Sequence, residues 1–246
     1  MTLNFIHDLF NKKIEEIKKL TFLLFYILYI IYLLSIKMRF TQPSSVQSNF
    51  ISNKIKFTNQ DDYYKTVAID NISKDEVLVI EYSKINLFGE NIDNRELKIL
   101  KKYIENKNAP FIINLYPRNY IYNKTNMIKS VHKLIKSIKN SDQKLYIFFD
   151  NIDKTEIEFY FAKYIYNAFE GNDFGPITLP HISKLNHSCK PNVYFILDRN
   201  TGCMYLKAIK NIKKGEEIKG SYLENKKINN HKLYLEEHYG FSCECI

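Results

Sequence analysis

A group of polar residues interrupts an apolar stretch in the last quarter of the chain. The segment KLNHSCKPNVYF, residues 184–195, places an amide, an imidazole, a hydroxyl and a thiol side by side, just before the alternation that contains Val193 and Phe195. Polar side chains beside a buried strand must be hydrogen-bonded or used for binding, because burying them unpaired costs free energy. Residues 184–195 are therefore the first candidate functional segment.

Cysteine is the second residue type here that could do chemistry. The chain has four cysteines, at positions 189, 203, 243 and 245. Four are too few for a disulfide framework in a chain of 246 residues, and a bridge between Cys243 and Cys245 would be strained because one residue separates them. The Cys-x-Cys pair is interpreted as a pair of metal ligands or as free thiols in a reducing compartment.

The composition argues against specific nucleic acid binding. The formal net charge of +9 comes from 36 Lys+Arg against 27 Asp+Glu, and the basic residues are nearly all lysines that are spread along the chain. A phosphate-binding face usually concentrates Arg or Lys within a recognisable module. No specific nucleic acid partner is predicted, and the 45% hydrophobic content is sufficient for a packed core.

The longest apolar segment lies near the N-terminus. Residues 20–36, LTFLLFYILYIIYLLSI, carry no charge and are flanked by Lys19 and Lys37. At about 1.5 Å per residue the segment reaches about 25 Å, the lower limit for a transmembrane helix. We predict a membrane anchor within residues 1–40, with the rest of the chain facing the cytosol. The alternative is a buried helix packed on the domain behind it, in a cytoplasmic or nuclear protein.

Changes of pattern along the chain predict its domain organisation. The polar residues 41–62 are predicted to be a linker. The parts predicted after the linker are a strand-rich part at 63–90, a helical part at 91–175, a second strand-rich part at 176–225 and a tail at 226–246. Strands and helices that are segregated in this way predict an α+β fold.

Hydrophobic periodicity predicts the individual elements. Two short strands are expected within residues 66–81, and a hairpin is expected from 192–198 and 203–209 around the turn at 199–202. Another short strand is expected to follow the turn at 214–218 and to close at 221–222. Helices are predicted at 93–107, 125–139 and 156–170, and a further strand is predicted at 144–150.

Three motifs in the C-terminal part resemble those of the SET domain family. They are LNHSCKPN at 185–192, GEEIKGSY at 215–222 and YGFSCEC at 239–245. The upstream segments AKYIYNAFE and GPITLPHISKLNHSC resemble the SMYD branch of that family. A MYND zinc finger is not expected, since no cysteine occurs between residues 1 and 188. The resemblance covers residues 160–245 closely and residues 66–90 loosely.

The resemblance implies both a fold and an activity. The implied fold is an α+β SET domain of short β-strands, with a knot-like C-terminal crossing, a helical insert and an N-terminal hydrophobic helix. SET proteins transfer methyl groups from S-adenosylmethionine, mostly to lysine side chains of proteins. The chain is accordingly expected to be a SET-type protein-lysine N-methyltransferase. Its expected partner is a protein substrate, histone or non-histone, with an exposed lysine.

The roles of individual residues are carried over from the matching motifs. Tyr222 matches the catalytic tyrosine whose hydroxyl lies by the transferred methyl group. The residues that match cofactor-binding positions are Asn186, His187, Tyr239 and Phe241. Phe169 matches a wall of the channel that admits the substrate lysine, and Tyr239 closes over the same channel.

The start of the SET-like region departs from the family pattern. A glycine-flanked basic turn usually contacts the cofactor carboxylate there, and DYYKTVAI at 62–69 occupies its place without a glycine. Lys65 is the residue that we expect to supply the positive charge. The departure leaves open a second function, in which a catalytically silent SET domain acts as a membrane-attached protein-interaction module.

The predicted zinc site is also incomplete. In relatives with a post-SET segment, the motif cysteine joins three tail cysteines around one zinc ion, and here Cys189, Cys243 and Cys245 match three of the four positions. Structural zinc takes four ligands in a tetrahedron. A water molecule, His238 or a ligand from a partner would complete the set. The alternative is that the three cysteines are reduced thiols without a metal.

Overall fold

The computed structural model of the chain describes residues 48–244, except 61–62, 88–89, 92, 120–123, 172–174, 199–200 and 224–229. The predicted anchor at 20–36 and the predicted metal ligand Cys245 therefore lie outside the described residues. Within the part that is described, no helix is both long enough and apolar enough to cross a membrane.

The main sheet has four antiparallel strands. Their spatial order is β1 (Phe50–Ile51), β4 (Val77–Tyr82), β9 (Cys203–Ala208) and β8 (Val193–Asp198). Strands β8 and β9 confirm the predicted hairpin, with Val193 opposite Ala208 and Asp198 opposite Cys203. One face of this sheet packs on the apolar core formed with the segments around Ile182 and Leu185.

Part of the predicted linker is strand. Residues 50–51 form β1, and β2 (Ile55–Gln60) pairs antiparallel with β3 (Tyr63–Ala68). Ile55 is buried against the core of the sheet, and Phe57 packs beside it. The linker prediction was wrong for these residues because an apolar side chain at every second position of a short polar segment is enough for a strand when a partner strand follows.

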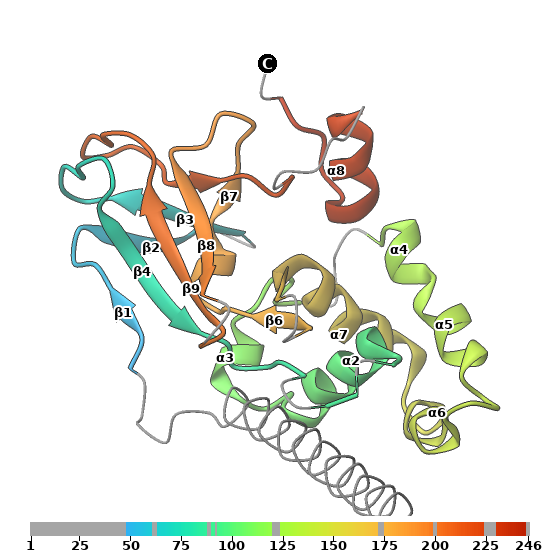
Figure 1. Cartoon of the computed structure of the whole chain (residues 1–246). Coiled ribbons are helices and arrows are strands. Elements are labelled where there is room, and N and C mark those ends of the chain that lie inside the picture. The colour runs from blue at the N-terminus through green and yellow to red at the C-terminus, as the bar shows by residue number, and fades with distance from the viewer. Residues whose placement is uncertain are drawn as a thin grey trace, which may run out of the picture. The chain divides into compact units, whose positions relative to one another are not determined.

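Two further strand pairs accompany the main sheet. Strand β5 (Ala168–Glu170) pairs antiparallel with β6 (Pro176–Thr178). Strand β7 (Asn186–His187) pairs parallel with β10 (Lys219–Gly220), which is the short strand expected after residues 214–218. Figure 1 shows β6 between this sheet and helices α2 (Arg95–Glu105) and α7 (Lys154–Asn167), whereas β7 lies beside β3 and β8. The parallel pair brings together two of the three motifs, although about thirty residues separate them in the sequence.

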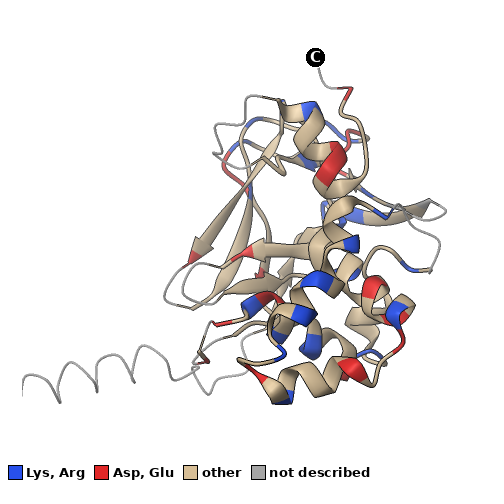
Figure 2. Cartoon of the chain, turned by 90° about the vertical axis from the view of Figure 1, so that its right-hand side faces the viewer, with Lys and Arg blue, Asp and Glu red and all other residues tan. Residues whose placement is uncertain are grey.

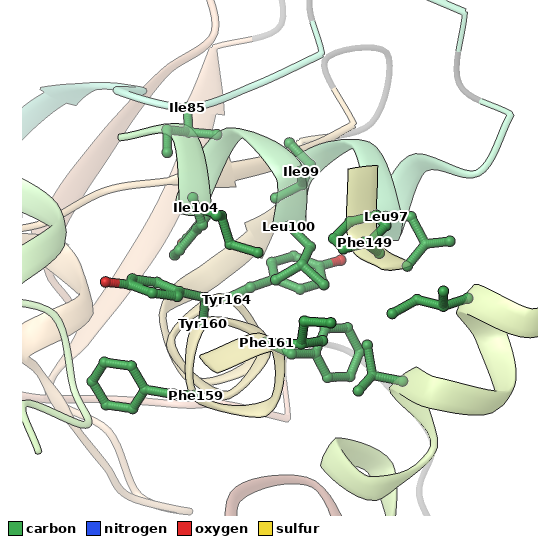
Figure 3. Packing of buried hydrophobic residues seen from close by; sticks show 14 of the residues in the cluster. Ile85, Leu97, Ile99, Leu100, Ile104, Phe149, Phe159, Tyr160, Phe161 and Tyr164 are labelled. Carbon is green, nitrogen blue, oxygen red and sulfur yellow. The ribbon is translucent and has the colours of Figure 1, made fainter. Parts of the chain in front are cut away.

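The helical part lies beside the main sheet. Its helices are α2 (Arg95–Glu105), α3 (Pro110–Ile113), α4 (Asn126–Lys129), α5 (Val131–Ser137), α6 (Gln143–Asp150) and α7 (Lys154–Asn167). The predicted helix at 125–139 is divided into α4 and α5 at Ser130, and the predicted helix at 156–170 ends at Asn167, where the chain continues as β5. Apolar side chains of α2 and α7 interlock to form the core of this part (Figure 3).

The predicted strand at 144–150 was wrong, because this segment is helix α6. The Asp142 side chain accepts a hydrogen bond from the backbone N–H of Leu145, which caps the start of the helix. The buried residues Leu145 and Phe149 are four positions apart and therefore lie on one helical face. The aromatic composition favoured a strand, but the cap and the spacing of the buried residues decide the structure.

The described tail consists of α8 (His231–Tyr239) and an extended segment that continues to residue 244. The helix ends at Gly240, which adopts a left-handed conformation with φ 73°. Leu235 of α8 and Cys243 of the extended segment are buried together with Leu223. Basic and acidic side chains are interspersed over the helices on the face drawn in Figure 2.

Candidate functional site

The amide of Asn186 is held where β7 and β10 meet. Its Nδ2 donates hydrogen bonds to the Tyr64 carbonyl oxygen at 3.0 Å and to Glu217 Oε1 at 2.7 Å. These two bonds connect the first motif to strand β3 and to the second motif. The orientation of the Asn186 side chain is thus fixed by contacts from two distant parts of the sequence.

His187 is buried and its protonation is defined by its neighbours. The backbone N–H of Tyr222 donates to His187 Nδ1 at 3.0 Å, and His187 Nε2 lies 3.2 Å from Cys189 Sγ. Because Nδ1 accepts, the proton of the neutral ring lies on Nε2. Burial, with smaller contributions from the charges of His231 and Lys219, lowers the pKa of His187 to about 4. The imidazole is therefore uncharged at neutral pH.

Tyr222 lies at the centre of an aromatic cluster. Its hydroxyl donates to the Leu185 carbonyl oxygen at 2.6 Å. Its ring centroid is 4.9 Å from that of Tyr239, 5.3 Å from that of His187 and 6.2 Å from that of Phe241. Burial raises the pKa of Tyr222 above its usual value. The hydroxyl is therefore protonated throughout the physiological range.

Two cavities adjoin this cluster. Cavity A has a volume of about 370 Å³, and its lining includes Tyr64, Lys184, Asn186, His187 and Phe241. Cavity B has a volume of about 210 Å³, and its lining includes Arg95, Phe169, Glu170, Leu185 and Phe195. Four residues line both cavities: Tyr166, Ser183, Tyr222 and Tyr239. The two cavities therefore meet at the predicted catalytic tyrosine.

The wall of cavity B depends on a close aromatic contact. The rings of Phe169 and Phe195 pack edge to face with centroids 5.4 Å apart. Phe195 in turn lies against the backbone of Gly220, where an added Cβ would be 2.4 Å from Phe195 Cζ. Glycine at position 220 thus allows β10 to approach this aromatic wall.

The structure brings the predicted catalytic, cofactor-binding and substrate-channel residues together, with the exception of Lys65. Asn186, His187 and Phe241 line cavity A, Phe169 lines cavity B, and Tyr222 and Tyr239 line both. Lys65 lies on β3, where its carbonyl oxygen accepts a hydrogen bond from Thr58 Oγ1, and it is not part of the lining of either cavity. Its neighbour Tyr64 faces cavity A, and successive residues of a strand point to opposite faces.

Ser183 and Lys184 were assigned no role from the sequence, although Lys184 begins the candidate segment 184–195. Within the described part of the chain, the buried hydroxyl oxygen of Ser183 has no hydrogen-bond partner, and the residue lines both cavities. A buried polar atom of this kind is suited to a ligand that supplies the missing bond. The only sequence signal for these two residues is their position directly before the Leu185–Asn192 motif.

Two of the three predicted metal ligands lie together. Cys189 Sγ and Cys243 Sγ are 3.5 Å apart and form a cluster with His187. Two thiolates on one tetrahedral zinc ion would be about 3.8 Å apart, so this pair fits a shared metal. His187 fits less well, since its Nδ1 accepts a backbone hydrogen bond and its Nε2 carries the proton. His238 lines cavity B and donates through Nδ1 to the Tyr234 carbonyl oxygen.

Comparison with known proteins identifies relatives for most of the chain. Residues 66–223 match the family model described as SET domain. SET domain-containing protein L678 of Acanthamoeba polyphaga mimivirus is 39% identical over 149 residues, which cover 59% of this chain and 54% of that protein. A SET domain-containing protein of Dictyostelium discoideum is 31% identical over 194 residues, covering 66% and 49%, respectively. The chain thus spans about half the length of these relatives.

The match also extends to proteins named as methyltransferases. The histone-lysine N-methyltransferase SMYD3 of Mus musculus is 35% identical over 92 residues, which cover 35% of this chain and 21% of SMYD3. Among solved structures, the SET domain of LSMT bound to lysine and AdoHcy superposes with a TM-score of 0.56 at 15% identity, covering 79% of this chain and 54% of that one. At this identity, the structural match shows a shared fold.

Proposed function

The chain belongs to the SET domain family, and we propose that it transfers methyl groups from S-adenosylmethionine to lysine side chains of a protein substrate, histone or non-histone. The observation that supports this proposal best is the meeting of the two cavities at Tyr222 and Tyr239. Cavity A would hold the cofactor, and cavity B would admit the lysine. The relatives named as lysine methyltransferases support the same reaction class.

The residues of cavity A provide contacts for a nucleoside with an amino-acid chain. Aromatic rings at Tyr64 and Phe241 offer flat apolar surfaces, while Asn186 and the unpartnered hydroxyl of Ser183 offer polar ones. Bound S-adenosylmethionine supplies a methyl group that is already activated on a sulfonium. The protein therefore has to align donor and acceptor and to exclude water.

The aromatic wall of cavity B would prepare the substrate lysine. A lysine is protonated at neutral pH because its unperturbed pKa is about 10.4, yet transfer requires the amine lone pair. Phe169, Phe195 and Tyr222 surround the amine with apolar groups, which disfavours the charged form by desolvation. The Tyr222 hydroxyl is protonated and held by Leu185, so its role is to position the amine and the methyl group rather than to act as a base.

Calorimetric titration of the full chain with S-adenosylmethionine tests the proposal. We expect the wild type to bind, and we expect Asn186→Ala to weaken binding by about tenfold or more, because the Asn186 side chain lines cavity A and its amide holds the Tyr64 carbonyl beside it. Asn140→Ala, in an exposed turn, is the matched control and should bind as the wild type does.

A second measurement addresses the reaction. Tyr222→Phe keeps the ring and removes the hydroxyl, so we expect cofactor affinity within about twofold of the wild type and methyl transfer lowered on the order of 10²-fold. Transfer is measured as tritium incorporated from labelled cofactor into the proteins of a cell extract, with methyl-lysine identified by mass spectrometry. A folded wild type that does not bind the cofactor would favour the silent interaction module, which the position of Lys65 outside cavity A supports.

We further propose that Cys189, Cys243 and Cys245 supply thiolates to a zinc ion. The support is the 3.5 Å separation of the first two sulfur atoms. Such an ion would fasten the extended segment that carries Phe241 to the segment that carries His187. The membrane anchor at residues 20–36 and the cytosolic orientation stay predictions.

A further inference from the structure

We propose that Lys184 supplies the positive charge that binds the carboxylate of S-adenosylmethionine in cavity A. The inference rests on the proposed function and adds a binding residue to it. It assigns to Lys184 the role that the sequence analysis gave to Lys65.

The backbone of Lys184 is fixed at the edge of cavity A. Lys184 is the last residue of the short helix η2 (Ile182–Lys184), two positions before Asn186. Its carbonyl oxygen accepts a hydrogen bond from Thr66 Oγ1 at 3.2 Å, and Thr66 is fully buried. The side chain therefore starts from a rigid point on the wall of the cavity.

Two aromatic rings flank the side chain. Lys184 Nζ lies 4.9 Å from the ring centroid of Tyr64 and 5.2 Å from that of Phe57. Ring faces attract a cation, so these contacts hold the ammonium in place without neutralising its charge. Burial lowers the pKa of Lys184, and the negative charge of Glu81 partly offsets this effect. Glu81 is fully buried and already accepts hydrogen bonds from the backbone N–H groups of His181 and Ile182.

The lining of cavity A makes this charge distinctive. Among the described residues of the lining, Lys184 is the only lysine, arginine, aspartate or glutamate. A cation at a partly desolvated site attracts an anion strongly. S-adenosylmethionine has a single anionic group, its carboxylate, together with an ammonium and a sulfonium. Lys184 would therefore attract the amino-acid end of the cofactor through this carboxylate, with the ammonium on the same carbon turned away from the lysine.

The neighbouring lysine cannot reach the same place. Lys65 follows Tyr64 on β3, and because Tyr64 faces cavity A, the side chain of Lys65 points to the other face of the strand. The two lysines form a matched pair for an experiment. They are close in space through the contacts of η2 with β3, but only Lys184 lines the cavity.

The test compares two ligands on each variant by calorimetry with the full chain. One ligand is S-adenosylmethionine, and the other is decarboxylated S-adenosylmethionine, which keeps the sulfonium and the ammonium. We expect Lys184→Met to weaken binding of S-adenosylmethionine by about tenfold or more and to change binding of the decarboxylated ligand by less than about twofold. Lys184→Arg should retain most of the affinity, and Lys65→Met should leave both affinities unchanged.

The ratio of the two affinities within one variant separates a charge contact from a loss of structure. If Lys184→Met weakens both ligands equally, or neither, the inference is overturned while the proposed function stands. If a folded wild type binds neither ligand, both are overturned. Lys184→Gln is a second variant in case methionine disturbs the contacts with Phe57 and Tyr64, and the same loss of preference for the carboxylate is expected.

Discussion

The buried Lys163 illustrates how a single side chain links the helical part to the site. Its Nζ donates hydrogen bonds to the carbonyl oxygens of Ile112 at 3.1 Å and Leu115 at 2.7 Å, which close the C-terminal end of α3. The next turn of α7 carries Asn167, whose amide donates to the Tyr116 carbonyl oxygen. Tyr116 and Asn167 both line cavity A. Lys163 thereby holds the loop that forms one side of cavity A.

The charge of Lys163 should make stability depend on pH. Burial, and to a lesser extent the charge of Arg118, lowers the pKa of Lys163 to about 8. Between that value and the unfolded value of about 10.4, the unfolded chain binds more protons, so the free energy of unfolding rises with pH in this window. We expect the wild type to gain on the order of 1 kcal/mol relative to Lys163→Met between pH 7 and pH 9.5, as measured by urea unfolding.

An unchanged difference between the two proteins over that pH range would contradict the lowered pKa. Lys129→Met is the control, because Lys129 is exposed at the end of α4. That variant should follow the wild type at both pH values. The comparison uses differences between proteins, so titration of other groups cancels.

At the level of residues, the sequence identified those that belong to recognisable motifs. Asn186, His187 and Tyr222 were found in this way, and the structure places them around one pair of cavities. Ser183 and Lys184 were assigned no role because their importance depends on which residues face a cavity, and that depends on long-range contacts such as those of β3 with Lys184 and of β7 with β10. Residue type and spacing do not encode such a pairing.

At the scale of elements, the contact between β10 and β8 shapes cavity B. Strand β10 passes so close to Phe195 of β8 that position 220 has no space for a side chain. The Phe195 ring contacts both the backbone at Gly220 and the ring of Phe169. A change at the backbone of one strand is therefore transmitted to the wall that would receive the substrate.

Gly220→Ala should destabilise the protein and disturb cavity B. The added methyl group overlaps Phe195 Cζ and forces the ring to move, which we expect to cost about 1–3 kcal/mol in the free energy of unfolding. Urea unfolding measures the loss. The double variant Gly220→Ala with Phe195→Leu should recover part of it, because the smaller side chain gives space to the new methyl group.

A control variant makes the double variant informative. Gly215→Ala adds a methyl group where no atom lies within 4 Å. Because residue 215 has a φ of 90°, alanine strains the backbone there and lowers the free energy of unfolding. Phe195→Leu should not relieve this loss. We expect the double variant to lose less free energy of unfolding than the two single variants lose together. A loss larger than this sum would show that the overlap with Phe195 is not the cause.

Element types were predictable from periodicity where local signals agreed with the packing. Helix α2 has its buried residues at helical spacing and was predicted within two residues at each end. Helix α6 was mistaken for a strand because its aromatic and β-branched residues outweighed the N-terminal cap at Asp142. Strand β2 was missed because its partner β3, rather than its own composition, determines that it forms a strand.

At the scale of the whole molecule, three distant segments meet at the site. Strands β7 and β10 supply the first two, and the tail after α8 supplies the third, with Phe241 in cavity A and Cys243 against Cys189. The tail is held by a small apolar cluster that includes Leu223 and Leu235. A cluster of this size buries little area, so an additional link between the tail and the rest of the domain would contribute strongly to closing cavity A.

Zinc is the link that we propose, and its removal should open the tail. We expect about one zinc ion per chain in protein purified under reducing conditions, measured by mass spectrometry of the metal. Cys243→Ser should lose the metal, lower the thermal midpoint by several degrees and weaken cofactor binding, since Phe241 is released together with the tail. A chelator should have the same effects on the wild type.

Cys203 provides the matched control, because it is buried on β9 and lies outside the cluster of His187, Cys189 and Cys243. Cys203→Ala should retain the metal, although a smaller side chain in the core lowers stability slightly. The two variants therefore separate loss of a ligand from loss of a buried thiol. Metal-free wild type that binds S-adenosylmethionine normally would favour the alternative of reduced thiols. In that case the apolar cluster around Leu235, together with the aromatic contacts of Tyr222 and Phe241, would be sufficient to keep the tail over cavity A.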